Sequence, residues 1–331
     1  MVNRDIGFSL WLDFVERDYL KNAFSSLIEK GIINGATSNP AIFASAITTS
    51  PAYKEQLEAL EGESAKKKYE ALAIEDIRTA AQKLRGVYDE GNDGYISIEV
   101  DPFLSHDTKG TIEEGKRLFA AIGEPNVMIK IPATEAGYDA MTELLSTGIS
   151  VNATLVFSPK QAKRCLKAMK KGLDAFEASG GGRCEAVISV FVSRFDRMLD
   201  ADLAAEGLEV SKTGIYNAAK IYNLIEAHHT PAVRTLFAST GVKGDDLPAA
   251  YYMQELLAPH AVNTAPLATI EAYIATEPNS PKLPIDDAVI DGYFTKLEDN
   301  GFAMDEVYAQ LLKEGLEAFE NAFQEMLDRL K

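Results

Sequence analysis

The feature that most constrains the fold is a repeated alternation of short apolar runs with longer amphipathic stretches. Eight runs are predicted to be strands, and they lie at residues 8–13, 35–40, 95–101, 127–133, 149–157, 186–193, 233–239 and 261–265. A stretch with helical periodicity follows each of them, for example residues 159–178 and 212–228. This order predicts parallel strands joined by helical crossovers. Eight repeats close a (β/α)8 barrel, and an open doubly wound sheet is the competing α/β arrangement.

The alternation of apolar and polar residues inside each run distinguishes the barrel from the open sheet. In the third run, Ile96, Ile98 and Val100 alternate with Ser97 and Glu99. Strands of an open parallel sheet are covered by helices on both faces and are apolar throughout. In a barrel the apolar face meets the helices, and the polar face points inward. Most inward polar residues lie near the C-terminal ends of their runs, where barrel active sites form, so the pattern favours a barrel enzyme.

The pattern changes after Pro266. Residues 267–276 and 286–300 have helical periodicity, and apolar positions between 307 and 330 predict a long amphipathic helix. No linker composition precedes this segment. We therefore expect one domain over residues 1–331, with a single-domain TIM barrel at about 8–265 and a helical extension at about 266–331. The extension is expected to cover the barrel mouth or to form an oligomer contact.

Charge and composition exclude several classes of function. The 50 acidic residues outnumber the 33 basic ones, and the net charge of −17 repels nucleic acid and anionic membrane surfaces. The first twenty residues lack a signal-peptide pattern, and no apolar stretch approaches the roughly 18–20 residues of a membrane span. We therefore expect a cytoplasmic protein. Two cysteines and four scattered histidines predict no disulfide framework, no metal site and no cofactor.

Lys130 is the most informative single residue, because it lies between Ile129 and Ile131 in the fourth run. Burial disfavours the charged form of an amine, and the free amine attacks carbonyl carbons to form a Schiff base. A structural ion pair with Glu99 or Asp13 is the alternative interpretation. Schiff-base chemistry also needs acids and bases to move protons, and Glu99 and Asp13 are inward carboxylates suited to that work.

Further polar residues favour a phosphorylated polyol as the substrate. Asn39, Asn152, Thr154 and Ser189 offer neutral hydrogen-bonding groups from the ends of several strands. Arg194 follows the sixth run, and the segment from Ser239 to Lys243 follows the seventh. Loops after the late strands of a barrel often bind phosphate, and an arginine fork matches the geometry of a phosphate dianion.

Seven segments together resemble transaldolase, in the longer form found in many bacteria and plants. They are SLWLDFVERDYL, GATSNPAIF, ISIEVDPFLSHDT, VMIKIPATEAG, ISVNATLVFS, VISVFVSRFDRML and LFASTGVK, in order over about residues 8–265. The resemblance implies a barrel enzyme of the pentose phosphate pathway that needs no cofactor. It implies transfer of a dihydroxyacetone unit from sedoheptulose 7-phosphate to glyceraldehyde 3-phosphate, giving erythrose 4-phosphate and fructose 6-phosphate.

The resemblance also implies a role for each matching residue. Lys130 is the Schiff-base lysine, Asp13 handles the proton of the C4 hydroxyl, and Glu99 and Thr154 hold a proton-shuttling water. The residues assigned to substrate binding are Thr37, Asn39, Asn152, Ser189, Phe191, Arg194, Ser239 and Lys243. The shorter form of the family has a second arginine where this chain has Gly241, so Lys243 is the nearest candidate cation for the phosphate.

Three other interpretations stay open at this point. An aldolase of the same superfamily would use the same lysine and release free dihydroxyacetone; it often has tyrosine at the position of Phe191, so the phenylalanine favours transfer. The others are a non-catalytic barrel that binds sugar phosphates and a metal-dependent barrel enzyme. The expected partners are the four sugar phosphates, with no nucleic acid and no membrane. A homodimer is one of the assemblies that the sequence leaves open.

Overall fold

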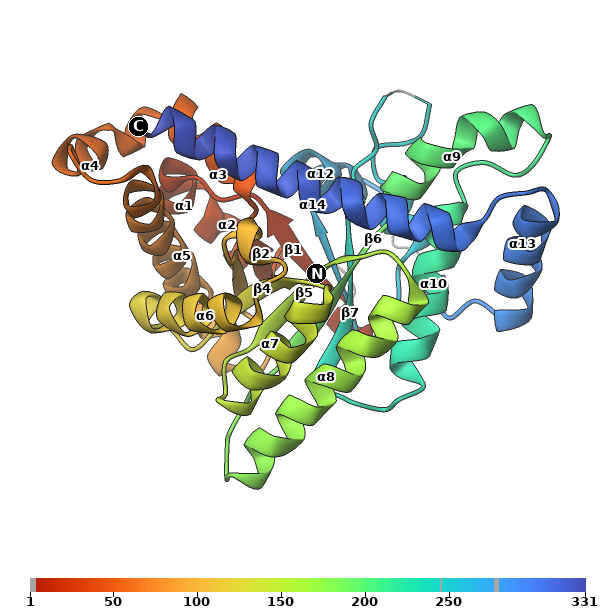
Figure 1. Cartoon of the computed structure of the whole chain (residues 1–331), viewed down its shortest axis with the longest axis horizontal. Helices are drawn as coiled ribbons and strands as arrows, with labels where there is room; N and C mark the ends of the chain where they lie inside the picture. The colour runs from red at the N-terminus through yellow and green to blue at the C-terminus, as the bar shows by residue number, and fades with distance from the viewer. Residues whose placement is uncertain (1–3, 245, 277–279) are drawn as a thin grey trace.

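Eight parallel strands close into a barrel in the order in which they occur in the chain (Figure 1). The computed structural model describes residues 4–244, 246–276 and 280–331. β8 pairs with β1 through four residues, from Ser9 opposite Val262 to Leu12 opposite Ala265, and this pairing closes the sheet. The predicted (β/α)8 barrel is thereby confirmed, and the open sheet was the wrong alternative.

Each of the eight predicted runs contains one strand. The strands are β1 (Ser9–Asp13), β2 (Gly35–Thr37), β3 (Ile96–Glu99), β4 (Val127–Pro132), β5 (Val151–Val156), β6 (Ala186–Phe191), β7 (Val233–Ala238) and β8 (Ala261–Ala265). β2 is the most shortened relative to its run, because Asn39 caps the next helix by accepting from the Ile42 N–H and Pro40 begins that helix. A proline fits the first helical position, where no backbone donor is needed.

Helices surround the barrel and pack on the apolar faces of the strands. They are α1 (Arg17–Asn22), α2 (Phe24–Glu29), α3 (Pro40–Thr49), α4 (Lys54–Ala59), α5 (Ala65–Asp89), α6 (Thr108–Ile122), α7 (Glu135–Ser146), α8 (Pro159–Ala178), α9 (Ser193–Ala205), α10 (Thr213–Glu226), α11 (Tyr251–Glu255), α12 (Leu267–Ile274), α13 (Asp287–Asp299) and α14 (Met304–Arg329). Short 3-10 turns are η1 (Arg4–Ile6), η2 (Pro51–Tyr53) and η3 (Pro102–Leu104). No helix in the described part of the chain is long and apolar enough to cross a membrane.

The C-terminal extension covers the mouth of the barrel. α14 runs across the molecule in Figure 1, from α13 toward α3 and α4. Phe323 of this helix is buried, and its ring centroid lies 5.3 Å from that of Tyr69 on α5. The helix therefore spans the C-terminal ends of the strands, which was one of the two expectations for this segment.

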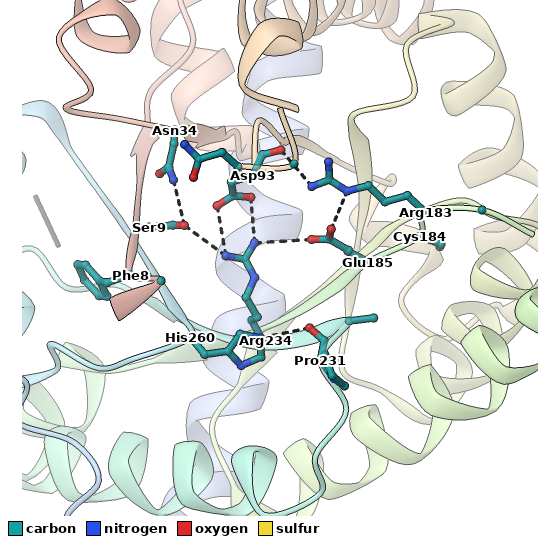
Figure 2. A pocket seen from close by; sticks show the side chains of 15 residues that line it. Phe8, Ser9, Asn34, Asp93, Arg183, Cys184, Glu185, Pro231, Arg234 and His260 are labelled. Carbon is teal, nitrogen blue, oxygen red and sulfur yellow. Dashed lines mark hydrogen bonds and ion pairs between the residues drawn. The ribbon is translucent and has the colours of Figure 1, made fainter. Parts of the chain in front are cut away.

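The opposite end of the barrel is closed by a network of ion pairs (Figure 2). Asp93 accepts a hydrogen bond from the indole N–H of Trp11 at 2.8 Å, and its carboxylate lies 2.9 Å from the guanidinium of Arg234. Glu185 bridges Arg234 at 3.9 Å and Arg183 at 2.7 Å. The two cations and two anions compensate one another, so the network forms a neutral polar floor.

We expect Asp93→Ala to lower the free energy of unfolding by about 3–5 kcal/mol, because it leaves the Arg234 guanidinium, whose side chain is only 12% exposed, without its main partner. Urea unfolding followed by circular dichroism measures the loss. Asp93→Asn is the matched control, since asparagine tolerates the left-handed backbone of this position (φ 80°) and still offers an oxygen to Trp11. A loss below about 1 kcal/mol for the alanine variant would show that the pair contributes only as much as an exposed one.

Candidate active site

A cavity of about 270 Å³ lies at the C-terminal ends of the strands, under α14. Its lining includes nine of the residues that the sequence predicted: Asp13, Thr37, Asn39, Lys130, Thr154, Ser189, Phe191, Arg194 and Ser239. The remaining lining residues are Ala41, Ala238, Thr264, Ala318, Phe319 and Ala322. Strand alternation brings together the lining residues that lie on the strands, because every second side chain of a barrel strand points inward; the others come from the loops and helices at the same end.

Lys130 lies in the middle of this group. It is buried in β4, where Glu99 of β3 is its register partner. Its Nζ is 3.4 Å from Glu99 Oε2 and donates to the carbonyl oxygen of Ser38 at 3.3 Å. The ring centroid of Phe319 lies 5.7 Å from the same nitrogen. The amine therefore faces the cavity with an acid on one side and an aromatic ring on another.

The two predicted carboxylates lie close to this amine and hold protons more tightly than exposed acids. Burial raises the pKa of Glu99 to about 7, although the positive charge of Lys130 opposes the shift. Burial also raises the pKa of Asp13, against Lys130 and hydrogen bonds from Thr37 and Asn39. The Thr37 hydroxyl donates to Asp13 Oδ1 at 2.7 Å. With a pKa near 7, the Glu99 carboxyl exchanges protons readily at neutral pH.

Two buried oxygen atoms in this region lack a polar partner among the residues that the structure describes, one on Thr154, which lines the cavity, and one on Glu99, which does not. Glu99 Oε1 and Thr154 Oγ1 have no hydrogen-bond partner within the described part of the chain. Buried polar atoms rarely stay unpaired, so they mark a place where a polar atom of a ligand or solvent binds. Asn152 does not line the cavity; its amide accepts from Ser189 at 2.6 Å and donates to Ser97 at 3.2 Å.

The other end of the cavity is cationic. Arg194 lies in the first turn of α9, and its guanidinium carbon is 5.2 Å from the centroid of the Phe191 ring. No ion pair of Arg194 occurs in the ranges that the structure describes. Burial and the charge of Arg197 lower the pKa of Arg194, and the charge of Glu314 opposes them. Asp196, the nearest acid in sequence, accepts instead from the Gly214 N–H at 2.9 Å. A half-buried arginine that lines a cavity and has no ion-pair partner among the described residues is suited to an anionic ligand.

Ser239 completes this end, and Lys243 lies outside it. The Ser239 hydroxyl is 3.0 Å from that of Ser193, the first residue of α9. Lys243 is exposed and does not line the cavity. The structure therefore brings one of the two expected cations to the site and leaves the other in the surrounding loop.

Sequence reasoning missed Thr264 and the residues of α14. Thr264 Oγ1 lies 2.7 Å from Thr37 Oγ1, and the alternation of the last strand contained the signal for it. Ala318, Phe319 and Ala322 carry no such signal, because an amphipathic pattern identifies an apolar face and not the surface that it covers.

The fold and the cavity together define a β/α barrel with a buried lysine and two carboxylates at the C-terminal ends of its strands. The chain belongs to the transaldolase/fructose-6-phosphate aldolase family, whose model matches residues 10–330. A protein of Campylobacter jejuni subsp. jejuni serotype O:23/36 (strain 81-176), named transaldolase, is 51% identical over 274 residues, which are 81% of this chain and 83% of the relative. A protein of Helicobacter pylori (strain Shi470) with the same name is 44% identical over 321 residues, covering 97% and 98% of the two chains.

Proposed function

We propose that this protein is a transaldolase, which moves a dihydroxyacetone unit between sugar phosphates through a Schiff base on Lys130. The observation that carries the proposal is the amine of Lys130, buried at the cavity wall 3.4 Å from Glu99. The named relatives favour transfer over release, because each is called a transaldolase. The particular sugars, the cytoplasmic location and a homodimeric assembly stay predictions.

The first half of the proposed reaction forms the covalent bond. Lys130 passes a proton to Glu99 and attacks the carbonyl carbon of the ketose, which gives a carbinolamine. Glu99 returns the proton to the departing hydroxyl through a water held by Thr154, and that hydroxyl leaves as water. The raised pKa of Glu99, about 7, suits an acid that must both accept and release this proton.

The second half breaks and remakes a carbon–carbon bond. Asp13 takes the proton of the C4 hydroxyl, the C3–C4 bond breaks, and its electron pair moves into the iminium to give an enamine. The aldehyde product leaves, an acceptor aldehyde enters, and the same steps run backward. Arg194 and Ser239 bind the phosphate, and the guanidinium that lines the cavity without an ion-pair partner among the described residues supports this assignment.

The test is an assay of the purified enzyme with fructose 6-phosphate, with and without erythrose 4-phosphate. A transaldolase forms sedoheptulose 7-phosphate when the acceptor is present and releases little dihydroxyacetone without it. An aldolase releases dihydroxyacetone at the same rate in both mixtures. A sugar-phosphate-binding barrel without catalysis gives neither product.

The acid limb of the pH profile is expected to report on Glu99. Its carboxylate accepts the proton of Lys130 only when ionised, so kcat/KM rises with pH through about 7 and falls as the pH drops below that value. Steady-state rates between pH 5 and 9 measure the profile. Glu99→Gln is expected to lower kcat/KM by about 100-fold and to remove this limb. An unchanged limb in the glutamine variant would assign the titration to another group.

A further inference from the structure

Phe319 is the one aromatic side chain that α14 contributes to the cavity. Its ring centroid lies 5.7 Å from Lys130 Nζ, a distance at which an aromatic face attracts a cation. Ala318 and Ala322 line the cavity beside it, and both are too small to cover the amine. The ring is therefore the part of α14 that separates the reactive nitrogen from the solvent side.

The position of this ring is fixed by contacts one turn away on each side. A Cβ atom at Gly315 would lie 3.4 Å from Arg194 Nη1 and 3.0 Å from Leu155, so the glycine lets the helix approach the barrel closely. Four residues beyond Phe319, the buried Phe323 packs edge-on against Tyr69. Residues four apart share one face of a helix, so both anchors hold Phe319 toward the cavity.

The reaction proposed above keeps a three-carbon unit on Lys130 while one aldehyde leaves and the next enters. During this interval Asp13 can return the proton that it took to the enamine carbon, which gives a cationic iminium. Water that adds to the iminium carbon then releases dihydroxyacetone and regenerates the Lys130 amine. A ring over the nitrogen stabilises the cation and excludes water from it. Small side chains at this place would do neither.

We propose that Phe319 is a specificity-determining residue that sets the ratio of transfer to release. The inference rests on the proposed function, because it concerns the fate of the unit bound to Lys130. The ring retains the three-carbon unit until an acceptor aldehyde arrives. Loss of the ring converts part of the transferase activity into release of free dihydroxyacetone.

The experiment measures dihydroxyacetone released per sedoheptulose 7-phosphate formed, with fructose 6-phosphate and erythrose 4-phosphate as substrates. This ratio does not depend on the fraction of folded enzyme. We expect it to rise about ten-fold in Phe319→Ala, which loses ring and bulk, and about three-fold in Phe319→Leu, which keeps apolar bulk. The leucine variant keeps the test available if the alanine variant does not fold.

Phe323→Leu is the matched control, since Phe323 lies on the same helix but does not line the cavity. It is expected to lower stability and leave the ratio unchanged. A ratio that stays constant in both Phe319 variants, or rises equally in Phe323→Leu, would overturn the inference. Borohydride trapping of the wild-type enzyme with fructose 6-phosphate separates the two hypotheses: without an adduct the proposed function fails, whereas an adduct with a constant ratio contradicts only the role of Phe319.

Discussion

Lys130→Ala is expected to abolish the covalent adduct that borohydride traps with fructose 6-phosphate, and to reduce turnover by at least about 10⁴-fold. The reason is geometric, because within the described residues Lys130 is the only amine that lines the cavity. Its loss removes the nucleophile and leaves Glu99 and Asp13 without their cation. Both acids have raised pKa values already, so they can become neutral and the barrel is expected to stay folded.

Intact-protein mass spectrometry measures the adduct, and peptide mapping locates it. Lys66→Ala is the control, because Lys66 pairs with Asp101 at 2.5 Å and Glu114 at 2.9 Å and does not line the cavity. That variant is expected to form the adduct at the wild-type level. Trapping that persists in Lys130→Ala would place the nucleophile at another residue and end the Schiff-base assignment.

Asp13→Ala is expected to separate imine formation from bond cleavage. Glu99 and Thr154 remain in place to form the imine, whereas the base for the C4 hydroxyl is gone, so cleavage is expected to slow by about 10²–10⁴-fold. Asp13→Asn is a useful second variant, because an amide oxygen can still accept the hydrogen bond that Thr37 donates. It retains the local structure and loses only the base.

The mass of the trapped adduct distinguishes the two steps. Wild-type enzyme with fructose 6-phosphate is expected to yield the three-carbon unit, and the Asp13 variants are expected to yield the uncleaved six-carbon chain. Quenched-flow sampling gives the rate of each species. If both variants lose imine formation and cleavage to the same extent, Asp13 acts on Lys130 and not on the C4 hydroxyl.

The inward half of the site was predictable because strands impose a period of two. The alternation alone assigns the polar residues of β1, β4, β5 and β6 to the interior, and Asp13, Lys130, Thr154 and Ser189 all line the cavity. The same alternation gives each strand one apolar and one polar face, which predicted that the strands close into a barrel. Lys130 and Glu99 became register partners because adjacent strands place them at the same height.

Contacts between distant segments could not be predicted in this way. Arg17 on α1 pairs with Asp76 on α5 at 2.8 Å, and Tyr53 donates to the same carboxylate at 2.8 Å. The sequence pattern of an amphipathic helix does not distinguish a charged residue that faces solvent from one that faces a buried partner. Phe319 is the case that matters most, because only the packing of α14 across the mouth gives it access to Lys130.

One end of the barrel stabilises the fold, and the other end forms the candidate binding site. At one end, Arg234 and Asp93 close the cylinder with charges that satisfy each other. At the other end, Arg194, Lys130 and Asp13 line the cavity, where they can contact a ligand. Substitutions around the cavity can therefore change which ligand binds, while the ion pairs at the opposite end maintain the barrel that positions the site.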